Sequence, residues 1–160
     1  MTYQMLGLLP ARTLTLLLLP ALISCASGAR SPRGSAILPD AWFIAKQCSR
    51  PGPPEHESTW QPGPEDIRAL EMRLGRLERM KARGCCLLGA RIRDIGHYYL
   101  QYVGIVSHGR RLIYINALED ESPNWRTTLV DVCDGGDGFW GAVFDPATGR
   151  FSDLAFNGEV

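Results

Sequence analysis

Two aspartates, Asp134 and Asp137, flank a pair of glycines near the carboxyl end of the chain. Carboxylate oxygens are the ligands that Ca²⁺ prefers, and Asp131 and Asp145 stand close enough in sequence to add to the set. The alternating spacing of an EF-hand is absent, however. A tight connection between two strands explains the same residues, because glycines adopt positive backbone angles and aspartates bond their own backbone. We therefore expect a turn here and predict neither a metal nor a cofactor.

Three histidines are the other candidates for chemistry, since imidazole titrates near neutral pH and can act as a general base. His108 falls in a predicted turn, His97 precedes a predicted strand, and His56 lies in a proline-rich stretch. No nucleophile elbow, metalloprotease motif or phosphate-binding glycine loop accompanies them. The sequence therefore favours a noncatalytic protein, with a periplasmic hydrolase that uses residues 134–137 as an alternative.

The first residues have the parts of an export signal. Arg12 precedes an apolar run from Leu14 to Ile23, which is too short to span a bilayer. The run Leu22-Ile23-Ser24-Cys25 then resembles the lipobox of bacterial lipoproteins. In that family the signal is removed before the cysteine, which receives a lipid, and a following residue other than aspartate favours the outer membrane.

That resemblance has consequences for where the protein resides. It implies that residues 1–24 are a signal peptide and that Cys25 carries an N-terminal lipid. It also implies that the protein is anchored to the cell envelope, at the outer membrane and facing the periplasm, because Ala26 is not aspartate. The alternative is ordinary cleavage at the small residues that follow, which would give a soluble periplasmic protein.

Five cysteines are present, and four remain if Cys25 is lipidated. The envelope is oxidising, so Cys48, Cys85, Cys86 and Cys133 can form disulfides. A bond between the adjacent Cys85 and Cys86 would strain the peptide between them. We therefore expect Cys133 to bond one of this pair and Cys48 the other, with a Cys48–Cys133 bond as the open alternative. The spacings match no common zinc pattern.

Two stretches before residue 65 have the composition of unpacked chain. Residues 26–37 are mostly small and polar, and residues 49–64 are rich in proline. Between them, residues 41–45 are apolar enough for a short strand. The predicted organisation is a lipidated tether and proline-rich connector over residues 25–64, followed by one globular domain over residues 65–160.

An amphipathic helix is the clearest predicted element of that domain. Gly63 is suited to cap it and Pro64 to the first helical position, with two acidic residues in the first turn. Gly84 is suited to end it. Apolar residues recur on one stripe at spacings of three and four: Ile67, Leu70, Leu74 and Leu77.

From Tyr98 onward, aromatic and β-branched runs alternate with turn residues, as in an antiparallel meander. Turns are predicted at His108-Gly109 and at residues 145–149. The predicted strands lie near residues 98–106, 110–118, 127–133, 139–145 and 150–156. The result is an α+β fold, with one amphipathic helix packed on a curled antiparallel sheet of about four to five strands. This order resembles the cystatin-like arrangement, an analogy of fold that implies no activity.

Three tyrosines form a candidate binding surface. Tyr98, Tyr102 and Tyr114 are predicted to lie together on the outer face of the sheet, where such a patch can bind an envelope protein, a peptide or a glycan. Asp134 and Asp137 are further candidate binding residues. The expectation depends on the other strand residues filling the core.

The charge balance sets limits on partners: 17 Lys and Arg against 17 Asp and Glu give no reason to expect nucleic-acid binding. Residues 97–160, especially the glycine-rich run 132–141 and the closing residues 156–159, look like small, uncharacterised exported proteins of proteobacteria. That resemblance implies no activity. The sequence therefore predicts a noncatalytic envelope lipoprotein that acts as a binding or inhibitory module, with a structural envelope spacer as a further alternative.

Overall fold

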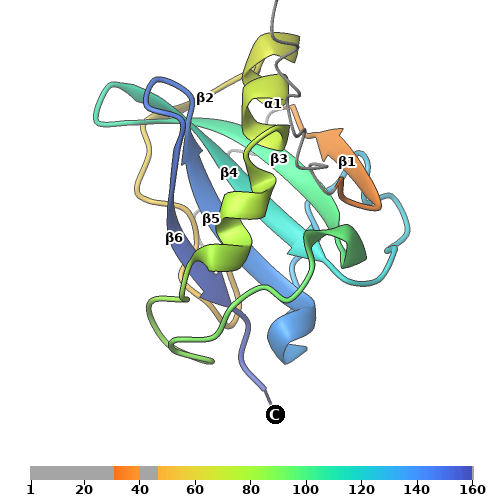
Figure 1. Ribbon diagram of the computed structural model, residues 1–160. Coiled ribbons are helices and arrows are strands. Elements are labelled where there is room, and N and C mark those ends of the chain that lie inside the picture. The colour runs from red at the N-terminus through yellow and green to blue at the C-terminus, as the bar shows by residue number, and fades with distance from the viewer. Residues whose placement is uncertain (1–30, 40–46, 160) are drawn as a thin grey trace, which may run out of the picture.

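The computed structural model of the protein describes residues 31–39 and 47–159. They form an α+β fold in which one helical segment lies across a face of a mixed, open sheet (Figure 1). The predicted class is confirmed, although the sheet is not purely antiparallel. The predicted strand at residues 41–45 lies outside the described residues. The elements in chain order are β1 (Gly34–Ile37), β2 (Ser58–Trp60), α1 (Pro64–Glu71), η1 (Leu74–Arg79), η2 (Ile95–His97), β3 (Tyr99–Ser107), β4 (Arg110–Leu118), η3 (Gly136–Gly138), β5 (Phe139–Asp145) and β6 (Arg150–Phe156).

Helix α1 begins where the sequence predicts. Gly63 caps it, and its backbone N–H donates to the Asp66 carboxylate at 3.0 Å. The α-helix ends at Glu71, however, and the chain continues as the 3₁₀ helix η1, so the predicted α-helix to Gly84 is too long. Gly75 lies within this change, and glycine loses more conformational entropy in a helix than any other residue.

The apolar stripe of this segment faces the sheet as predicted. Leu70, Leu74 and Leu77 are fully buried, and Ile67 is half-buried. The change to 3₁₀ geometry keeps Leu74 and Leu77 on the same side, because residues three apart eclipse one another in such a helix. The change of helix type therefore leaves the buried leucines pointing toward the sheet.

The sheet has the order β1-β3-β4-β5-β6, and β2 pairs with β3 outside this path. Strands β3 to β6 form the predicted antiparallel meander, each within one residue of its predicted position. His108 and Gly109 turn the chain between β3 and β4 with positive φ angles of 49° and 71°. The next predicted turn closes where the Gly149 N–H donates to the Asp145 carbonyl at 2.8 Å. Both turn predictions are confirmed.

The predicted strand at residues 127–133 is wrong, because this stretch is irregular. Amide side chains from the sheet bind its carbonyl groups instead. Gln101 Nε2 donates to the Thr128 carbonyl at 2.7 Å, and Asn116 Nδ2 donates to the Val130 carbonyl at 2.8 Å. Its β-branched residues suit a strand, but the backbone has found side-chain partners in place of a neighbouring strand.

Two short strands lie in the stretches that were expected to be unpacked. β1 pairs in parallel with the first half of β3, and β2 pairs antiparallel with its second half. The expectation of an unpacked tether and connector is therefore wrong for these strands. Gly104 of β3 permits the close approach of β2, because a Cβ there would collide with the Trp60 carbonyl.

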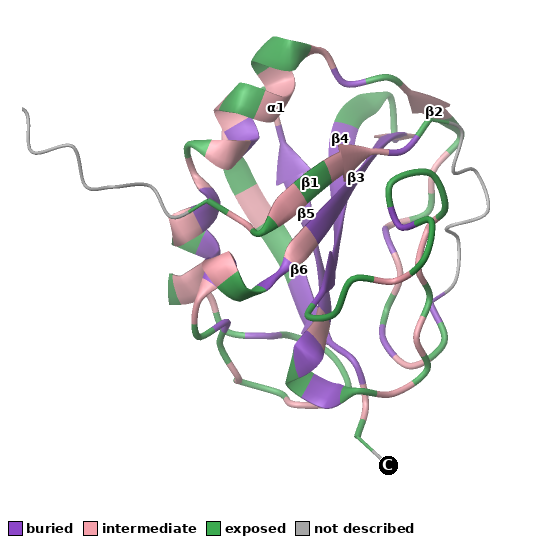
Figure 2. Ribbon diagram, turned by 90° about the vertical axis from the view of Figure 1, so that its right-hand side faces the viewer, coloured by how far each residue is buried: buried purple, intermediate pink, exposed green. Residues whose placement is uncertain are grey.

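The face of the sheet under the helix is apolar. Trp140 and Phe144 of β5 and Phe156 of β6 are fully buried there with the leucines of α1 and η1. Figure 2 shows the buried strands between the helical segment on one side and irregular chain on the other. This helix-covered face is the main core of the protein.

The opposite face, which we call the coil-covered face, is packed under residues 47–57 and 119–133. It has a smaller apolar cluster made of Leu38, Val103, Ile105, Leu112, Tyr114 and Val143. Beside this cluster lies buried Arg50, whose guanidinium donates to the side-chain oxygens of Asn116 and Asn157. Longer bonds reach Gln47 at 3.2 Å and Tyr114 at 3.3 Å. No carboxylate of the described residues lies within ion-pair distance of Arg50.

A disulfide joins the two segments that cover this face. Cys48 and Cys133 are bonded across a sequence separation of 85. The preferred prediction, Cys133 with Cys85 or Cys86, is therefore wrong, and the alternative pairing is the one found. Tertiary structure decides this, because the two covering segments meet over the sheet, whereas Cys85 and Cys86 are both unbonded and lie on a separate loop after η1.

Candidate binding site

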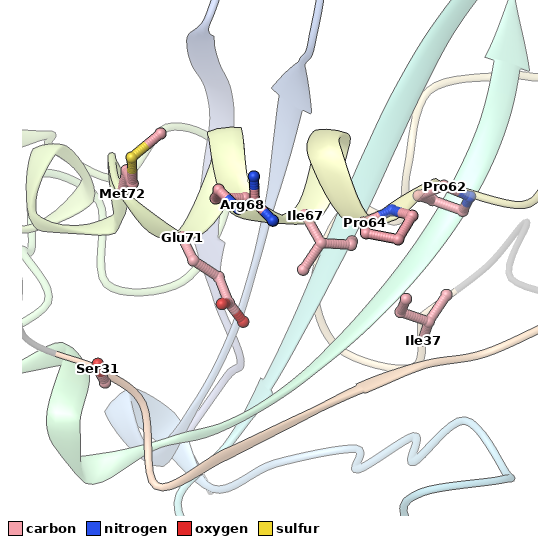
Figure 3. A pocket seen from close by; sticks show the side chains of 8 residues that line it. All are labelled: Ser31, Ile37, Pro62, Pro64, Ile67, Arg68, Glu71 and Met72. Carbon is pink, nitrogen blue, oxygen red and sulfur yellow. The ribbon is translucent and has the colours of Figure 1, made fainter.

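A groove opens between helix α1 and strand β1 (Figure 3). Its volume is about 640 Å³, within the range of ordinary ligand pockets, roughly 300–1,000 Å³. The residues that line it are Ser31, Ile37, Pro62, Pro64, Ile67, Arg68, Glu71 and Met72. They come from the chain before and within β1, from the approach to the helix, and from the outer side of α1.

The walls of the groove are mainly apolar because two elements leave side chains only partly covered. Ile67 stands at the border of the helix stripe and points into the gap, where Ile37 of β1 faces it (Figure 3). Both are half-buried. Met72 has 61% of its surface exposed, one of two large apolar side chains so exposed in the described part of the chain.

Two charged side chains line the groove, Arg68 and Glu71 (Figure 3). Glu71 Oε1 accepts hydrogen bonds from Ser35 Oγ at 2.9 Å and from Tyr102 Oη at 3.3 Å. Burial, together with the neighbouring Glu71 carboxylate, raises the pKa of Tyr102, so its hydroxyl stays protonated and donates. Among the described residues, no lysine or arginine forms an ion pair with Glu71. Glu71 is half-buried, so its carboxylate can also accept a hydrogen bond from a ligand in the groove.

The groove can hold a ligand through two kinds of contact. The walls offer an apolar surface, and the carboxylate offers a fixed acceptor for a donor or a cation. Sequence reasoning missed the groove because it depends on β1, which was assigned to the tether. The only signal was Met72, an apolar residue outside the predicted helix stripe.

The predicted patch of exposed tyrosines is wrong. Tyr98, Tyr102 and Tyr114 are all buried, and they lie in different places: the first two in the helix-covered core and Tyr114 in the coil-covered cluster. Burial, with the nearby Asp137 and Glu119 charges, raises the pKa of Tyr98 to about 12. The outer face of the sheet is not exposed, because irregular chain covers it.

The four candidate aspartates make separate contacts, and the Asp134 carbonyl accepts a hydrogen bond from Asn157 Nδ2 at 3.0 Å. Asp137 is exposed and pairs with Arg93 at 3.5 Å, while its carbonyl accepts the Tyr98 hydroxyl at 2.9 Å. Asp145 pairs with Arg110 at another turn, and Asp131 accepts the Cys48 N–H at 3.2 Å. Within residues 31–39 and 47–159, no group of three or more His, Cys, Asp or Glu is arranged to hold a metal ion.

The histidines are distributed over the surface. His108 lies in the turn just before β4, whereas the aspartate turn adjoins Phe139, which pairs with Leu118 at the end of β4. β4 is nine residues long, so its two ends lie roughly 26 Å apart. His97 is exposed at the end of η2, and His56 Nδ1 lies 3.1 Å from the Pro54 carbonyl. His108 and the aspartate turn therefore do not share a site.

Comparison with protein-family models, with curated proteins and with solved structures finds no match to this chain. In the part of the chain that the structure describes, no helix is both long and apolar enough to cross a membrane.

Proposed function

We propose that the protein is a noncatalytic binding module of the bacterial cell envelope, and that its groove binds an extended, largely apolar peptide segment of another envelope protein. The position of the groove beside a sheet edge carries this proposal. β1 ends the strand order, so its outer side pairs with no other described strand. Unpaired backbone groups at a sheet edge accept an added strand, and pockets beside the edge then select its side chains.

The charge of the groove adds a second requirement on the peptide. Glu71 stands beside the apolar wall formed by Ile37 and Ile67. A strand added along β1 presents alternate side chains to the same face. The peptide that fits best therefore has apolar residues at alternate positions and a lysine or arginine that reaches Glu71.

A defined peptide library tests this proposal. We expect the protein to select, from synthetic proline-free hexapeptides, sequences with alternating apolar residues and one basic residue. Ile67→Glu places a charge in the groove and should weaken these peptides at least tenfold. Glu71→Gln should remove the preference for a basic residue.

The matched control is Leu88→Glu, because Leu88 is 76% exposed and lies outside the groove. This variant should bind the selected peptides as the wild type does. If the library yields no such pattern, or if Ile67→Glu selects the same peptides with equal affinity, the groove is not the peptide site.

We also propose that the domain is held at the outer membrane, facing the periplasm, by a lipid on Cys25. The lipobox resemblance supports this, and the Cys48–Cys133 disulfide is typical of exported proteins. Cys25→Ser should abolish labelling by a fatty-acid analogue and move the protein from the membrane to the soluble fraction. An unlipidated wild-type protein whose amino terminus is Arg30 would contradict the proposal.

The arrangement of helix and sheet is, in our proposal, cystatin-like. The open sheet and the helical segment across one of its faces support this description. The parallel strand β1 is an addition to that arrangement. Because fold alone does not carry function, the likeness assigns no inhibited enzyme. An experimental structure in which the sheet does not curl around the helix would contradict it.

A further inference from the structure

Two adjacent thiols stand at the tip of a closed loop. Cys85 is exposed and Cys86 is half-buried, and neither forms a disulfide. Their Sγ atoms lie 2.9 Å apart. The loop is closed at its base, because the Ala82 N–H donates to the Ala90 carbonyl at 2.8 Å and the Gly89 N–H donates to the Ala82 carbonyl at 3.1 Å. The fold therefore presents both sulfur atoms together at the surface.

The local backbone is bent to bring the thiols to the same side. Cys86 and Leu87 have positive φ angles of 62° and 25°, which residues with a side chain rarely adopt. Such conformations persist where the surroundings require them, and they gather at functional sites. Here both thiols donate to one acceptor, the Ser49 carbonyl, at 3.7 Å from Cys85 and 3.2 Å from Cys86.

We propose that Cys85 and Cys86 form a thiol–disulfide exchange site, which takes an external disulfide as co-substrate and closes reversibly to a disulfide between the two. The proposal stands on the loop geometry and does not depend on the groove or its peptide. It assigns the pair a role different from that of Cys48–Cys133, which joins distant segments of the fold.

The exchange balances in two steps. The Cys85 thiolate attacks one sulfur of the external disulfide, which breaks the S–S bond, releases one thiolate and leaves a mixed disulfide on Cys85. The Cys86 thiolate then attacks Cys85 Sγ, which forms the Cys85–Cys86 bond and releases the second thiolate. Both cysteine protons end on the two released thiols, so the pair is oxidised by two electrons and the co-substrate is reduced by two.

The order of attack follows from exposure and acidity. Cys85 is the more exposed sulfur and meets the external disulfide first. The pKa of the Cys86 thiol is raised by its hydrogen bond with Cys85, then by partial burial and by the Cys85 charge. Cys86 is therefore the resolving thiol.

The product is easily reduced again. Adjacent Cα atoms are about 3.8 Å apart, which is shorter than the separation of roughly 4.4–6.8 Å in ordinary disulfides. Strained or exposed disulfides have more oxidising potentials and are the labile ones in proteins. Closure also removes both S–H donors from the Ser49 carbonyl, so oxidation weakens the contact between the loop and the segment that contains Cys48.

Oxidised glutathione is the probe for the test. Both thiols lie in one tryptic peptide, residues 84–91, because Arg83 precedes it and Arg91 ends it. We expect the full exported protein, reduced under mild conditions and then incubated with oxidised glutathione, to yield this peptide lighter by two hydrogens. Reduced glutathione should reverse the change while Cys48–Cys133 stays bonded.

Single variants separate the two thiols. Cys86→Ser should stop at a stable glutathione adduct on Cys85, and Cys85→Ser should form its adduct at least tenfold more slowly. Circular dichroism checks that both variants are folded. The proposal is overturned if the wild-type peptide keeps both thiols, if it accumulates a glutathione adduct without closing, or if either thiol becomes bonded to Cys48 or Cys133.

Discussion

The two faces of the sheet are covered in different ways. The helix-covered face is packed with apolar side chains, including fully buried Trp140 and Leu74. On the coil-covered face, amide and hydroxyl groups bind Arg50, which belongs to one of the two covering segments that the disulfide joins. Burial of apolar area is nondirectional, whereas a buried polar network needs each partner in place. We therefore expect the helix side to tolerate a change of helix type, and the coil side to depend on its cross-link and specific hydrogen bonds.

Each face of the sheet has a buried tryptophan whose NMR signal can report changes in that face. Trp140 is fully buried under the helix, and Trp125 is buried on the coil side, where its ring packs against Tyr99 with centroids 5.1 Å apart. Fluorine NMR of fluorotryptophan-labelled protein can follow the two indoles separately. A change in one face should move the signal of its own tryptophan first.

Removal of the disulfide is expected to have the largest effect. Cys48→Ser with Cys133→Ser should lower the free energy of unfolding by about 4 kcal/mol, because the bond closes a long loop in the unfolded chain. Denaturant unfolding measures this value. The Trp125 signal should shift more than the Trp140 signal, and proteolysis near Gly135 should increase.

The matched control for that prediction is Cys85→Ser with Cys86→Ser, which removes two thiols that form no disulfide. Its stability should stay within about 0.5 kcal/mol of the wild type. Equal losses in the two double variants would show that the disulfide is not what holds the coil-covered face.

Truncation of a side chain in the helix-covered core is expected to have the second largest effect on stability. Leu74→Ala should cost about 3 kcal/mol, because a fully buried leucine leaves a cavity when it is removed. The Trp140 signal should shift and the Trp125 signal should change little. Arg79→Ala is the control, since Arg79 is exposed, whereas Arg73 donates to the Ala69 carbonyl at 2.7 Å. Small, equal effects at Leu74 and Arg79 would contradict burial of the stripe.

Loss of the buried arginine should have the smallest of the three effects. Arg50→Met should cost about 2 kcal/mol, because it leaves buried oxygens of Asn116 and Asn157 without a charged donor. Arg50→Lys should recover only part of this, since lysine lacks the planar fork that reaches several acceptors. If Arg50→Met is as stable as the wild type by thermal unfolding, the network fills space and does not hold the coil in place.

The meander was predictable because its signals are local. The β-branched and aromatic runs that became β3 to β6 are separated by residues such as Gly109 and Gly149, which supply positive φ angles where the chain turns. The helix start was predictable for the same reason, since Gly63 and Pro64 act within one turn. The end of the α-helix was not, because Leu74 and Leu77 satisfy the core in either helix type.

The candidate site could not be predicted, because its parts are distant in sequence. Ile37 and Ile67 face each other only after β1 has paired with β3, and nothing in the composition of residues 26–37 marks a strand. The tyrosine patch failed for two reasons, the first being that Tyr98 and Tyr102 lie on the helix-covered face and not on the outer one. Alternation places Tyr114 on the face opposite the helix, but it cannot show that irregular chain covers that face.

The sequence by itself determined the α+β class, the four long strands with their turns and the buried stripe of the helical segment. These follow from periodicity and turn chemistry, which act over a few residues. Tertiary structure alone decided the partner of Cys133, the cover of the second face and the groove beside β1. Each of these depends on which distant segments of the chain come into contact. The local composition of a segment does not show which distant segment it will contact.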